Sequence, residues 1–408
     1  MLMIKLMIFY AIFSYQFNAG FNAQSKQVSS FDNIKLVREN NNVKIAFVGD
    51  VMVHGPQLKA QYNKEIERYD FTNNFKYIKR YIESADIAVL NLETTLAGED
   101  KGGYTSFPMF NSPDELVYAL KDTGFDLASV CNNHTLDRKA YGLNRTLDVL
   151  EQNGIAYTGV RKNEEDNNYT IITKNNIKVG IVAYTYEKDV NGRDTLNGNV
   201  IPENEKTLIN TFDYDYIDED LVKMKKVINK MKNDGAEFII FGMHWGNEYQ
   251  DEPSVYQQKI ANFLCENGVN VIVGSHPHIL QKFDTIEVGD KKTYVFYSIG
   301  NFISNQRYEI LKQRKSENGI IIELDISKDM LGRVVIDNVS YVPTWVNKYV
   351  EGGKTSYEIL PLNEDLSKFK LNYKDNLWRA QNALETIQKV IGIGSMKINI
   401  RNAIIPSI

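Results

Sequence analysis

The segment VKIAFVGDVMVHG at residues 43–55 decides the fold, because an apolar, β-branched run ends there on a carboxylate and then a histidine. Continuous runs rich in Val and Ile are typical of strands buried on both faces of a parallel sheet. Asp50 closes this run, and a carboxylate in that position is costly unless it is paired or bound to a metal. The segment therefore predicts a buried strand at residues 43–49 and a chemical role for Asp50.

Five further apolar runs repeat this pattern, and amphipathic helical stretches separate several of them. The runs lie at residues 86–92, 125–130, 178–184, 237–243 and 269–274. Apolar residues recur at helical spacing in residues 218–235 and 254–268, which predicts two helices. After residue 282 the strand patterns follow one another directly, as in hairpins. This order of elements predicts an α/β protein with two packed mixed β-sheets flanked by helices.

Composition narrows the class of function. The 408 residues include 47 Lys and Arg against 52 Asp and Glu, for a formal net charge of -5. This mild acidity argues against nucleic acid as a partner, because nucleic-acid binding needs a clustered basic face. The two cysteines, Cys131 and Cys265, each lie in an apolar run and are expected to be small core residues. A single bridge between them stays open at this point.

The first 25 residues differ from the rest of the chain. Lys5 precedes the apolar run LMIFYAIF at residues 6–13, with small residues near Ala19 and Ala23. The run is shorter than the roughly 20 residues of a membrane span, and it matches the layout of an export signal. The alternative is a buried N-terminal strand or helix. We expect residues 1–25 to be a signal peptide or N-terminal membrane anchor, which places the protein at the extracytoplasmic face of the cell membrane or outside the cell.

All the histidines of the chain follow the ends of predicted strands. They are His54, His134, His244, His276 and His278. Ligands of open α/β sheets bind outside the carboxyl ends of the strands, where loops bring distant residues together. In the HPH sequence at residues 276–278, an extended backbone would turn both rings to one side. The histidines are therefore candidate metal ligands.

Carboxylate and amide side chains at the same strand ends complete a candidate ligand set. Glu93 follows the run at 86–92, and Asn133 precedes His134. Imidazole, carboxylate and amide oxygen together suit Mn, Fe or Zn. A carboxylate can bridge two such cations, which activate a water molecule between them at neutral pH. The pattern thus indicates a two-metal hydrolase site.

Six short motifs occur in an order that identifies a family resemblance. They are FVGDVM (47–52), NLETTL (91–96), NNHTLD (132–137), HWGNEY (244–249), GSHPHILQ (274–281) and SIGNFISNQ (298–306). The set resembles the CapA-type poly-γ-glutamate capsule biosynthesis proteins, a bacterial branch of the calcineurin-like metallophosphoesterase superfamily. The resemblance implies an α/β/β/α metallophosphoesterase-like sandwich at residues 43–345. A helix pattern around residues 374–391 predicts that residues 346–408 form a C-terminal helical extension.

The resemblance also implies two divalent metal ions. The implied ligands are Asp50, Glu93 and His278 for one ion, with Glu93 shared, and Asn133, His244 and His276 for the other. The superfamily usually has a histidine where this chain has Met52, and an aspartate where it has Glu93. A thioether is a poor ligand for hard metals, so the first metal position departs most from the pattern.

Four further residues receive roles by position in the motifs. His134 corresponds to the histidine that protonates the leaving group. His54, four residues beyond Asp50, would substitute for the missing ligand at Met52 if its direction allows. Glu248 and Asn301 fall in family motifs and are expected to contact the ligands or the substrate.

Two functions of different class fit these observations. The first is a membrane-associated, metal-dependent hydrolase of capsule or cell-envelope polymer synthesis, acting on a phosphoester or on an amide of an anionic γ-glutamyl polymer. The second is a non-catalytic subunit of a membrane polymer-synthesis complex, whose other subunits are its partners. A serine or cysteine nucleophile is disfavoured because no G-x-S-x-G sequence occurs.

Overall fold

The computed structural model describes residues 41–393 and 399–400, so the apolar N-terminal segment predicted at residues 1–25 lies outside the described residues. A first mixed sheet has the strand order β19-β18-β17-β1-β4-β5-β6, with β16 beside β1 and β20 beside β18. Its strands are β1 (Asn42–Val51), β4 (Ile87–Leu92), β5 (Leu127–Ser129), β6 (Ala156–Thr158), β16 (Asn301–Ile303), β17 (Asn318–Lys328), β18 (Val334–Glu351), β19 (Lys354–Pro361) and β20 (Asn399–Ile400). Strands β1, β4, β5 and β6 are parallel to one another, whereas β17, β18 and β19 are antiparallel.

A second mixed sheet has the order β10-β9-β8-β12-β13-β15-β14, with β7 and β11 beside β8. Its strands are β7 (Thr170–Lys174), β8 (Ile177–Asp189), β9 (Asp194–Leu196), β10 (Asn199–Val200), β11 (Thr211–Asp213), β12 (Phe238–His244), β13 (Val271–Ser275), β14 (Phe283–Val288) and β15 (Lys291–Phe296). The central strands β8, β12, β13 and β15 run parallel. A separate hairpin joins β2 (Tyr62–Asn63) to β3 (Arg68–Tyr69).

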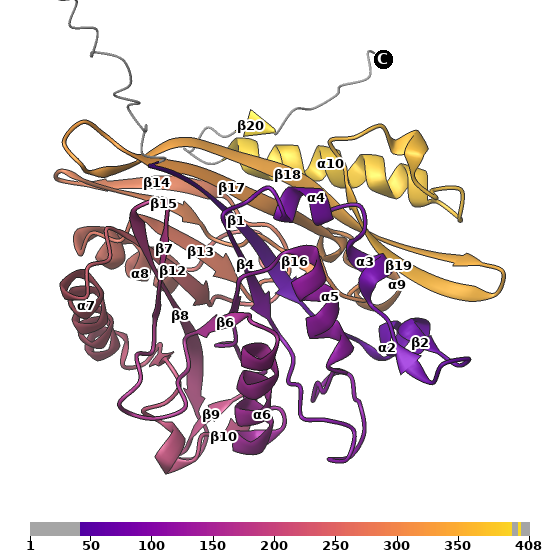
Figure 1. The fold of residues 1–408 in the computed structure, drawn as a ribbon, viewed down its shortest axis with the longest axis horizontal. Helices are drawn as coiled ribbons and strands as arrows, with labels where there is room; N and C mark the ends of the chain where they lie inside the picture. The colour runs from indigo at the N-terminus through magenta and orange to yellow at the C-terminus, as the bar shows by residue number, and fades with distance from the viewer. Residues whose placement is uncertain (1–40, 394–398, 401–408) are drawn as a thin grey trace, which may run out of the picture. The chain divides into compact units, whose positions relative to one another are not determined.

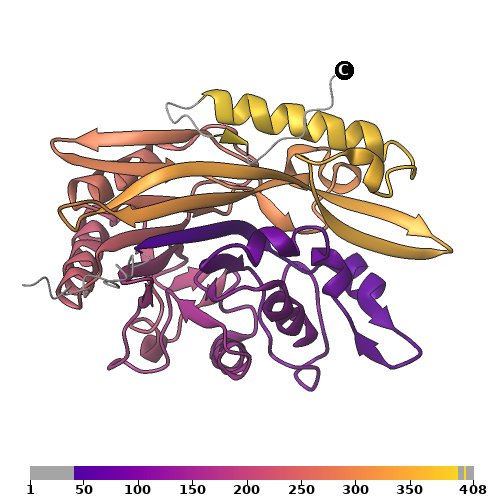
Figure 2. The ribbon, with the colours of Figure 1, turned by 45° about the horizontal axis from the view of Figure 1, so that its top comes forward.

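Helices cover the outer faces of the two sheets (Figures 1 and 2). The first sheet is covered by α2 (Gly55–Gln61), α3 (Thr72–Phe75), α4 (Lys79–Ile82), α5 (Glu115–Thr123) and α6 (Lys139–Gln152). The second is covered by α7 (Ile217–Asn233) and α8 (Val255–Glu266). Helix α10 (Asn376–Ile393) packs on β17 and β18. Shorter turns are α9 (Tyr308–Leu311), η1 (Glu203–Glu205), η2 (Lys315–Glu317) and η3 (Leu366–Lys368).

The strands that form the centre of each sheet are buried on both faces. In β1, Ile45 and Phe47 face the core between the sheets, while Ala46 and Val48 face the core beneath the helices. Alternate residues of β12 divide in the same way between the inter-sheet core and the core beneath α7 and α8. Two apolar faces per strand explain why these segments read as continuous apolar runs. The prediction of two packed mixed sheets flanked by helices is confirmed.

The C-terminal part of the chain extends the first sheet before it becomes helical. The predicted division at residue 345 falls within β18, and β19 pairs with β18 beyond it. Helix α10 then contributes Ala380, Ala383 and Ile387 to the core that also lies between the sheets. Residues 346–361 are therefore sheet residues, and the helical character of the segment begins later.

The structure also bears on a possible disulfide bridge and on possible membrane-spanning helices. Cys131 and Cys265 are both buried free thiols, so no bridge joins them. Within the described residues, no helix combines the length and the apolarity that crossing a bilayer requires.

Truncation of Ile240 tests how much the core between the sheets contributes to the stability of the protein. This β12 side chain has no exposed surface, and truncation to alanine leaves a cavity in a region that packs as densely as a crystal. We expect Ile240→Ala to lower the free energy of unfolding by about 2–5 kcal/mol in a denaturant titration. The same change at Ile66, whose side chain is 60% exposed, is the control and should change stability little. Equal losses in both variants would contradict this packing.

Candidate metal centre

The polar residues predicted at strand ends meet where the parallel strands of both sheets finish. Asp50 lies near the end of β1, and Glu93 follows β4 directly. His244 is the last residue of β12, and His276 and His278 follow β13. Gly49 permits the close approach of β1 to the segment before β16, because a Cβ on Gly49 would lie 1.8 Å from the Gly300 carbonyl oxygen.

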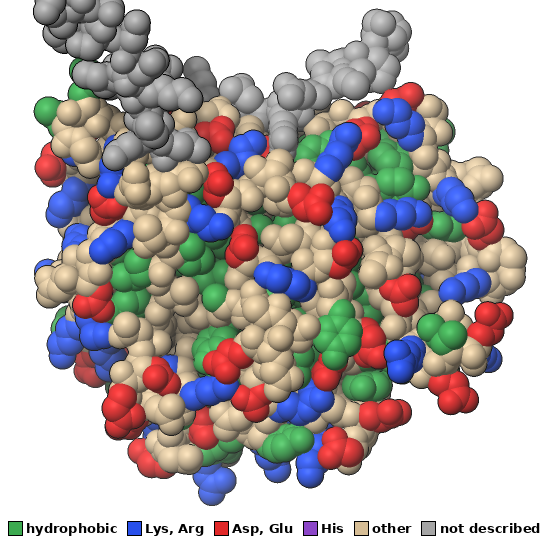
Figure 3. All heavy atoms as spheres, in the orientation of Figure 1, with side chains coloured by type: hydrophobic (Ala, Val, Ile, Leu, Met, Phe, Trp, Pro, Cys, Tyr) green, Lys and Arg blue, Asp and Glu red, His purple; other side chains and the backbone are tan. Residues whose placement is uncertain are grey.

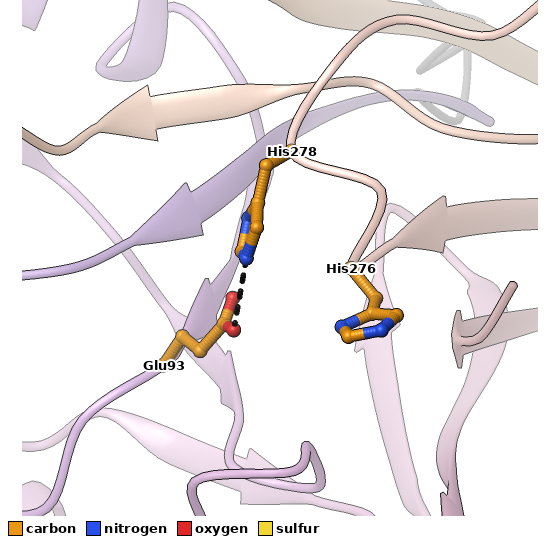
Figure 4. A group of neighbouring side chains, drawn as sticks. All are labelled: Glu93, His276 and His278. Carbon is orange, nitrogen blue, oxygen red and sulfur yellow. Dashed lines mark ion pairs between the residues drawn. The ribbon is translucent and has the colours of Figure 1, made fainter. Parts of the chain in front are cut away.

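Two groups of buried side chains place possible ligand atoms within 4.8 Å of one another. One group is Glu93, His276 and His278, and the other is Asp50, Glu93 and His244. In Figure 4, His278 points toward the Glu93 carboxylate, and His276 lies beside it on the same loop. Glu93 belongs to both groups, as a bridging carboxylate would. The partition of the histidines differs from the one that the family resemblance implies, in which His278 accompanies Asp50.

Two buried polar atoms of this cluster have no hydrogen-bond partner. They are Oε1 of Glu93 and Nδ1 of His276. The Glu93 oxygen lies 3.8 Å from Nε2 of His244 and 3.7 Å from Nε2 of His278. Buried polar atoms are almost always satisfied, and an orphaned carboxylate oxygen is especially costly. A divalent cation would satisfy both atoms, so the donor set fits a metal.

Burial raises the pKa of Glu93 well above its ordinary value, and the charges of Asp50 and Glu248 add to this effect. Burial is also the main cause that lowers the pKa values of His244 and His276 well below the ordinary range, with neighbouring histidines contributing. These imidazoles are therefore neutral at physiological pH and keep a lone pair for a metal. A cation would in turn stabilise the ionised form of Glu93.

His278 is held from behind by two oxygen atoms. Its Nδ1 lies 3.0 Å from Oδ2 of Asp50 and 3.1 Å from Oδ1 of Asn301. With the proton on Nδ1, the ring donates toward these oxygens, and Nε2 is left as the lone pair that faces Glu93. Asn301 is fixed in turn by donating to Gln306 and to the carbonyl of Ser316.

The expectation of an extended backbone through residues 276–278 is wrong. His276 and His278 have φ values of 91° and 57°, in the left-handed region that non-glycine residues rarely adopt. The loop after β13 turns sharply here, and this turn, not strand alternation, brings both rings to the cluster. Strain of this kind costs about 1–3 kcal/mol per residue and is found mainly at functional sites.

His244 and Asn133 contact each other across the two sheets. Nε2 of His244 lies 2.9 Å from Oδ1 of Asn133, and its Nδ1 lies 3.0 Å from the Ser275 hydroxyl. The structure thus brings the predicted amide ligand onto the ring nitrogen that also approaches Glu93.

His134 forms a buried pair with an aspartate. Its Nδ1 lies 2.7 Å from Oδ2 of Asp137, and its ring packs edge-on against Phe110 at 4.7 Å between centroids. No hydrogen bond to Nε2 occurs among the described residues. The carboxylate fixes the orientation of the ring and leaves Nε2 directed away from the pair. This is the arrangement that a positioned proton donor requires.

His54 lies near the cluster without joining either group of ligand atoms in the described part of the chain. Its Nδ1 accepts a hydrogen bond of 3.2 Å from the backbone N–H of Asn305, and its ring packs edge-on against Phe110. Burial lowers its pKa to about 4. Met52 is buried. His54 therefore lies outside both groups of ligand atoms, and its Nδ1 is engaged by Asn305.

Some residues of the site escaped the sequence analysis. Asn91 donates to Oδ1 of Asp50 at 2.8 Å and lies 3.5 Å from Nδ1 of His244. Asn132 donates to Oδ1 of Asn91 and to the carbonyl of Leu92. Both residues and Asp137 lie inside the quoted motifs, and their strand-end positions were a usable signal. Glu248, by contrast, is exposed and affects the cluster through its charge.

A comparison with protein families matches residues 44–306 to the bacterial capsule synthesis protein family PGA_cap. The chain belongs to this family. The matched range contains every residue of the candidate centre and all six motifs of the sequence analysis. The match to the PGA_cap family therefore covers the part of the chain that carries the candidate metal centre.

Two curated relatives carry related names. The chain is 29% identical over 273 residues to the capsule biosynthesis protein CapA of Bacillus anthracis, covering 66% of this chain and 61% of that protein. It is 22% identical over 295 residues to the PGA biosynthesis protein CapA of Bacillus subtilis (strain 168), covering 71% and 69%. Among solved structures, the Haemophilus influenzae NAD nucleotidase NadN aligns with a TM-score of 0.44 at 14% identity, covering 89% of this chain and 64% of that one.

Metal binding should depend on Glu93 and on pH. We expect Zn²⁺ or Mn²⁺ to raise the thermal unfolding temperature of chelator-treated protein. At a metal concentration a hundredfold above Kd, binding should add about 2.7 kcal/mol to the free energy of unfolding. The affinity should rise with pH through the elevated pKa of Glu93, because the proton on this carboxyl group competes with the cation and is lost as the pH increases. Glu93→Gln should abolish the metal-dependent stabilisation, while Glu65→Gln, at an exposed site, should not. A metal response that survives in Glu93→Gln would contradict the assignment.

Proposed function

We propose that this PGA_cap protein is a metal-dependent hydrolase that acts in the synthesis of a capsule or cell-envelope polymer. The observation that carries the proposal is the His134–Asp137 pair beside a buried cluster that holds unsatisfied ligand atoms. A structural metal site has no use for a histidine that a carboxylate orients and that binds no ligand.

Two divalent ions, of Mn, Fe or Zn, would be held by the six side chains that the two sheets bring together. They are Asp50, Glu93, Asn133, His244, His276 and His278. Bound there, the ions would supply Lewis acidity and a water nucleophile at neutral pH. Glu93 would be shared between them because it belongs to both groups of ligand atoms.

The chain's own residues would then divide the proton transfer and the binding. His134, protonated and held by Asp137 at 2.7 Å, would give its proton from Nε2 to the departing oxygen or nitrogen. Asp50 and Asn301 would keep His278 in the tautomer that directs Nε2 to Glu93. Phe110 packs against both His134 and His54 and would exclude water from that side of the reacting bond.

The proposed substrate is a phosphoester or an anionic polymer, and phosphoester chemistry is preferred because the motifs resemble those of phosphoesterases. We propose the extracytoplasmic face of the membrane as the place of action, on the basis of the apolar run at residues 6–13. The proposed partners are other subunits of a membrane polymer-synthesis complex, and the names of the Bacillus relatives support a role in capsule synthesis.

A second candidate function is a non-catalytic subunit of the same complex that keeps one metal for structural reasons. Met52 favours it, because this buried side chain replaces a superfamily ligand and His54 is engaged by Asn305 instead. Metal content distinguishes the two functions, since the hydrolase requires about two ions per chain.

His134→Ala provides the direct test of catalysis. The purified protein would be assayed with Mn²⁺ against a panel of phosphodiesters and against poly-γ-glutamate, with bound metal measured by elemental analysis. We expect His134→Ala to lower kcat about 10²–10⁴-fold while the metal content stays at the wild-type value, because the residue moves a proton and binds no ion. Asp137→Asn should also lower kcat while the metal content stays at the wild-type value, since it removes the carboxylate that orients the His134 ring.

Asp50→Asn and His244→Ala serve as the matched variants that should lose both metal and turnover. Turnover that is unaffected by these two changes would exclude the hydrolase proposal. Full metal content without turnover on any substrate of the panel would favour the non-catalytic subunit.

A further inference from the structure

A cavity of about 110 Å³ lies between the end of β18, the loop before α10 and the segment that follows β16. Four cationic side chains line it, together with the carboxylate of Glu309 and the amides of Asn305 and Asn376. The four cations are Arg307, Lys348, Lys374 and Arg379. Its volume exceeds what a single water molecule needs.

The two arginines are buried and fixed by carboxylates behind the cavity. Arg307 and Arg379 are 3% and 5% exposed, and both pair with the buried Glu317. Arg379 also pairs with Glu309 at 2.6 Å, and Arg307 donates to the carbonyl of Val346. Asp375 approaches Arg379 at 3.8 Å, but it approaches Arg314 at 3.9 Å as well. The arginine forks are therefore held rigidly at the wall.

The lysines leave an excess of positive charge. Lys348 is half-buried, and its ammonium donates to Oδ1 of Asn305 at 3.1 Å. No carboxylate lies within ion-pair distance of Lys348 or Lys374 in the described part of the chain. The four cations at the cavity are therefore balanced by only two carboxylates, Glu309 and Glu317. Two positive charges have no counter-ion there among the described residues. Burial and the charge of Arg307 lower the pKa of Lys348, as expected for an ammonium without a counter-ion.

This excess is local. On the face of the molecule that Figure 3 shows, Lys and Arg side chains are interspersed with Asp and Glu, without a continuous basic surface. A buried or half-buried cation needs a partner, and Arg and Lys together are the side chains that recognise oxyanions. We propose that this cavity is a binding site for a small oxyanion of the phosphate or carboxylate type, separate from the candidate metal centre.

The site is linked to the metal centre through one residue. Asn305 accepts from Lys348 and from the Tyr357 hydroxyl with its side chain, while its backbone N–H donates to His54. Residues 301–307 therefore contact His278 through Asn301 and line the oxyanion cavity through Asn305 and Arg307. An anion that draws the Lys348 ammonium into the cavity would therefore disturb its hydrogen bond to Asn305, whose backbone N–H donates to His54.

Calorimetric titration of the full chain tests the proposal. Chelator in the buffer keeps the metal centre from binding the probes, and low ionic strength limits screening. The two probes are inorganic phosphate and sodium glutamate, which identify the preferred oxyanion. We expect one of them to bind at one site per chain. The double variant Lys348→Gln/Lys374→Gln should weaken this binding at least about tenfold, because it removes both excess charges.

The control is Lys225→Gln/Lys226→Gln, which makes the same change of net charge on the exposed face of α7 and should bind as the wild type does. Lys348→Arg should retain binding because it retains the charge. Lys374→Gln alone alters only an exposed side chain and should not affect folding. Weaker anion binding by this variant would therefore reflect the lost charge. Absence of binding by both probes, or equal binding by the pocket and control variants, would overturn the proposal without bearing on the metal centre.

Discussion

The burial of the Glu93 carboxylate is the constraint on which the rest of the site depends. One of its oxygens has no partner among protein atoms, and its pKa is raised by burial and by neighbouring carboxylates. A protein that holds such a group must neutralise it with a proton or a cation. The surrounding histidines favour a cation, because their lowered pKa values keep them neutral and able to bind one.

The two-sheet architecture makes this concentration of polar groups possible. Parallel strands from both sheets finish at one edge, so residues far apart in the sequence meet there while the strands themselves remain apolar. Side chains behind the ligands then fix their directions. Asn91 bonds Asp50, Asn301 lies behind His278, and Asp137 holds His134. The fold positions the site, and hydrogen bonds set its tautomers.

Much of this arrangement was predictable, and the exceptions have physical causes. Strand-end position identified the members of the two ligand groups, because apolar strands leave few polar residues at their ends. These members are Asp50, Glu93, His244, His276 and His278. The conformation of residues 276–278 was not predictable, since a left-handed backbone at histidine violates local preference and is imposed by the tertiary structure. The orientation of the His54 side chain was not predictable either, because it depends on a hydrogen bond from Asn305, which lies 251 residues further along the chain.

Glu93 is therefore proposed to ligate a metal together with the histidines of both sheets. Anomalous X-ray scattering from crystals grown with Zn²⁺ tests it most directly. We expect an anomalous peak about 2.0–2.2 Å from Oε1 of Glu93, within reach of His276 and His278 or of Asp50 and His244. Crystals that hold zinc only at surface sites, with no ion beside Oε1 of Glu93, would contradict it.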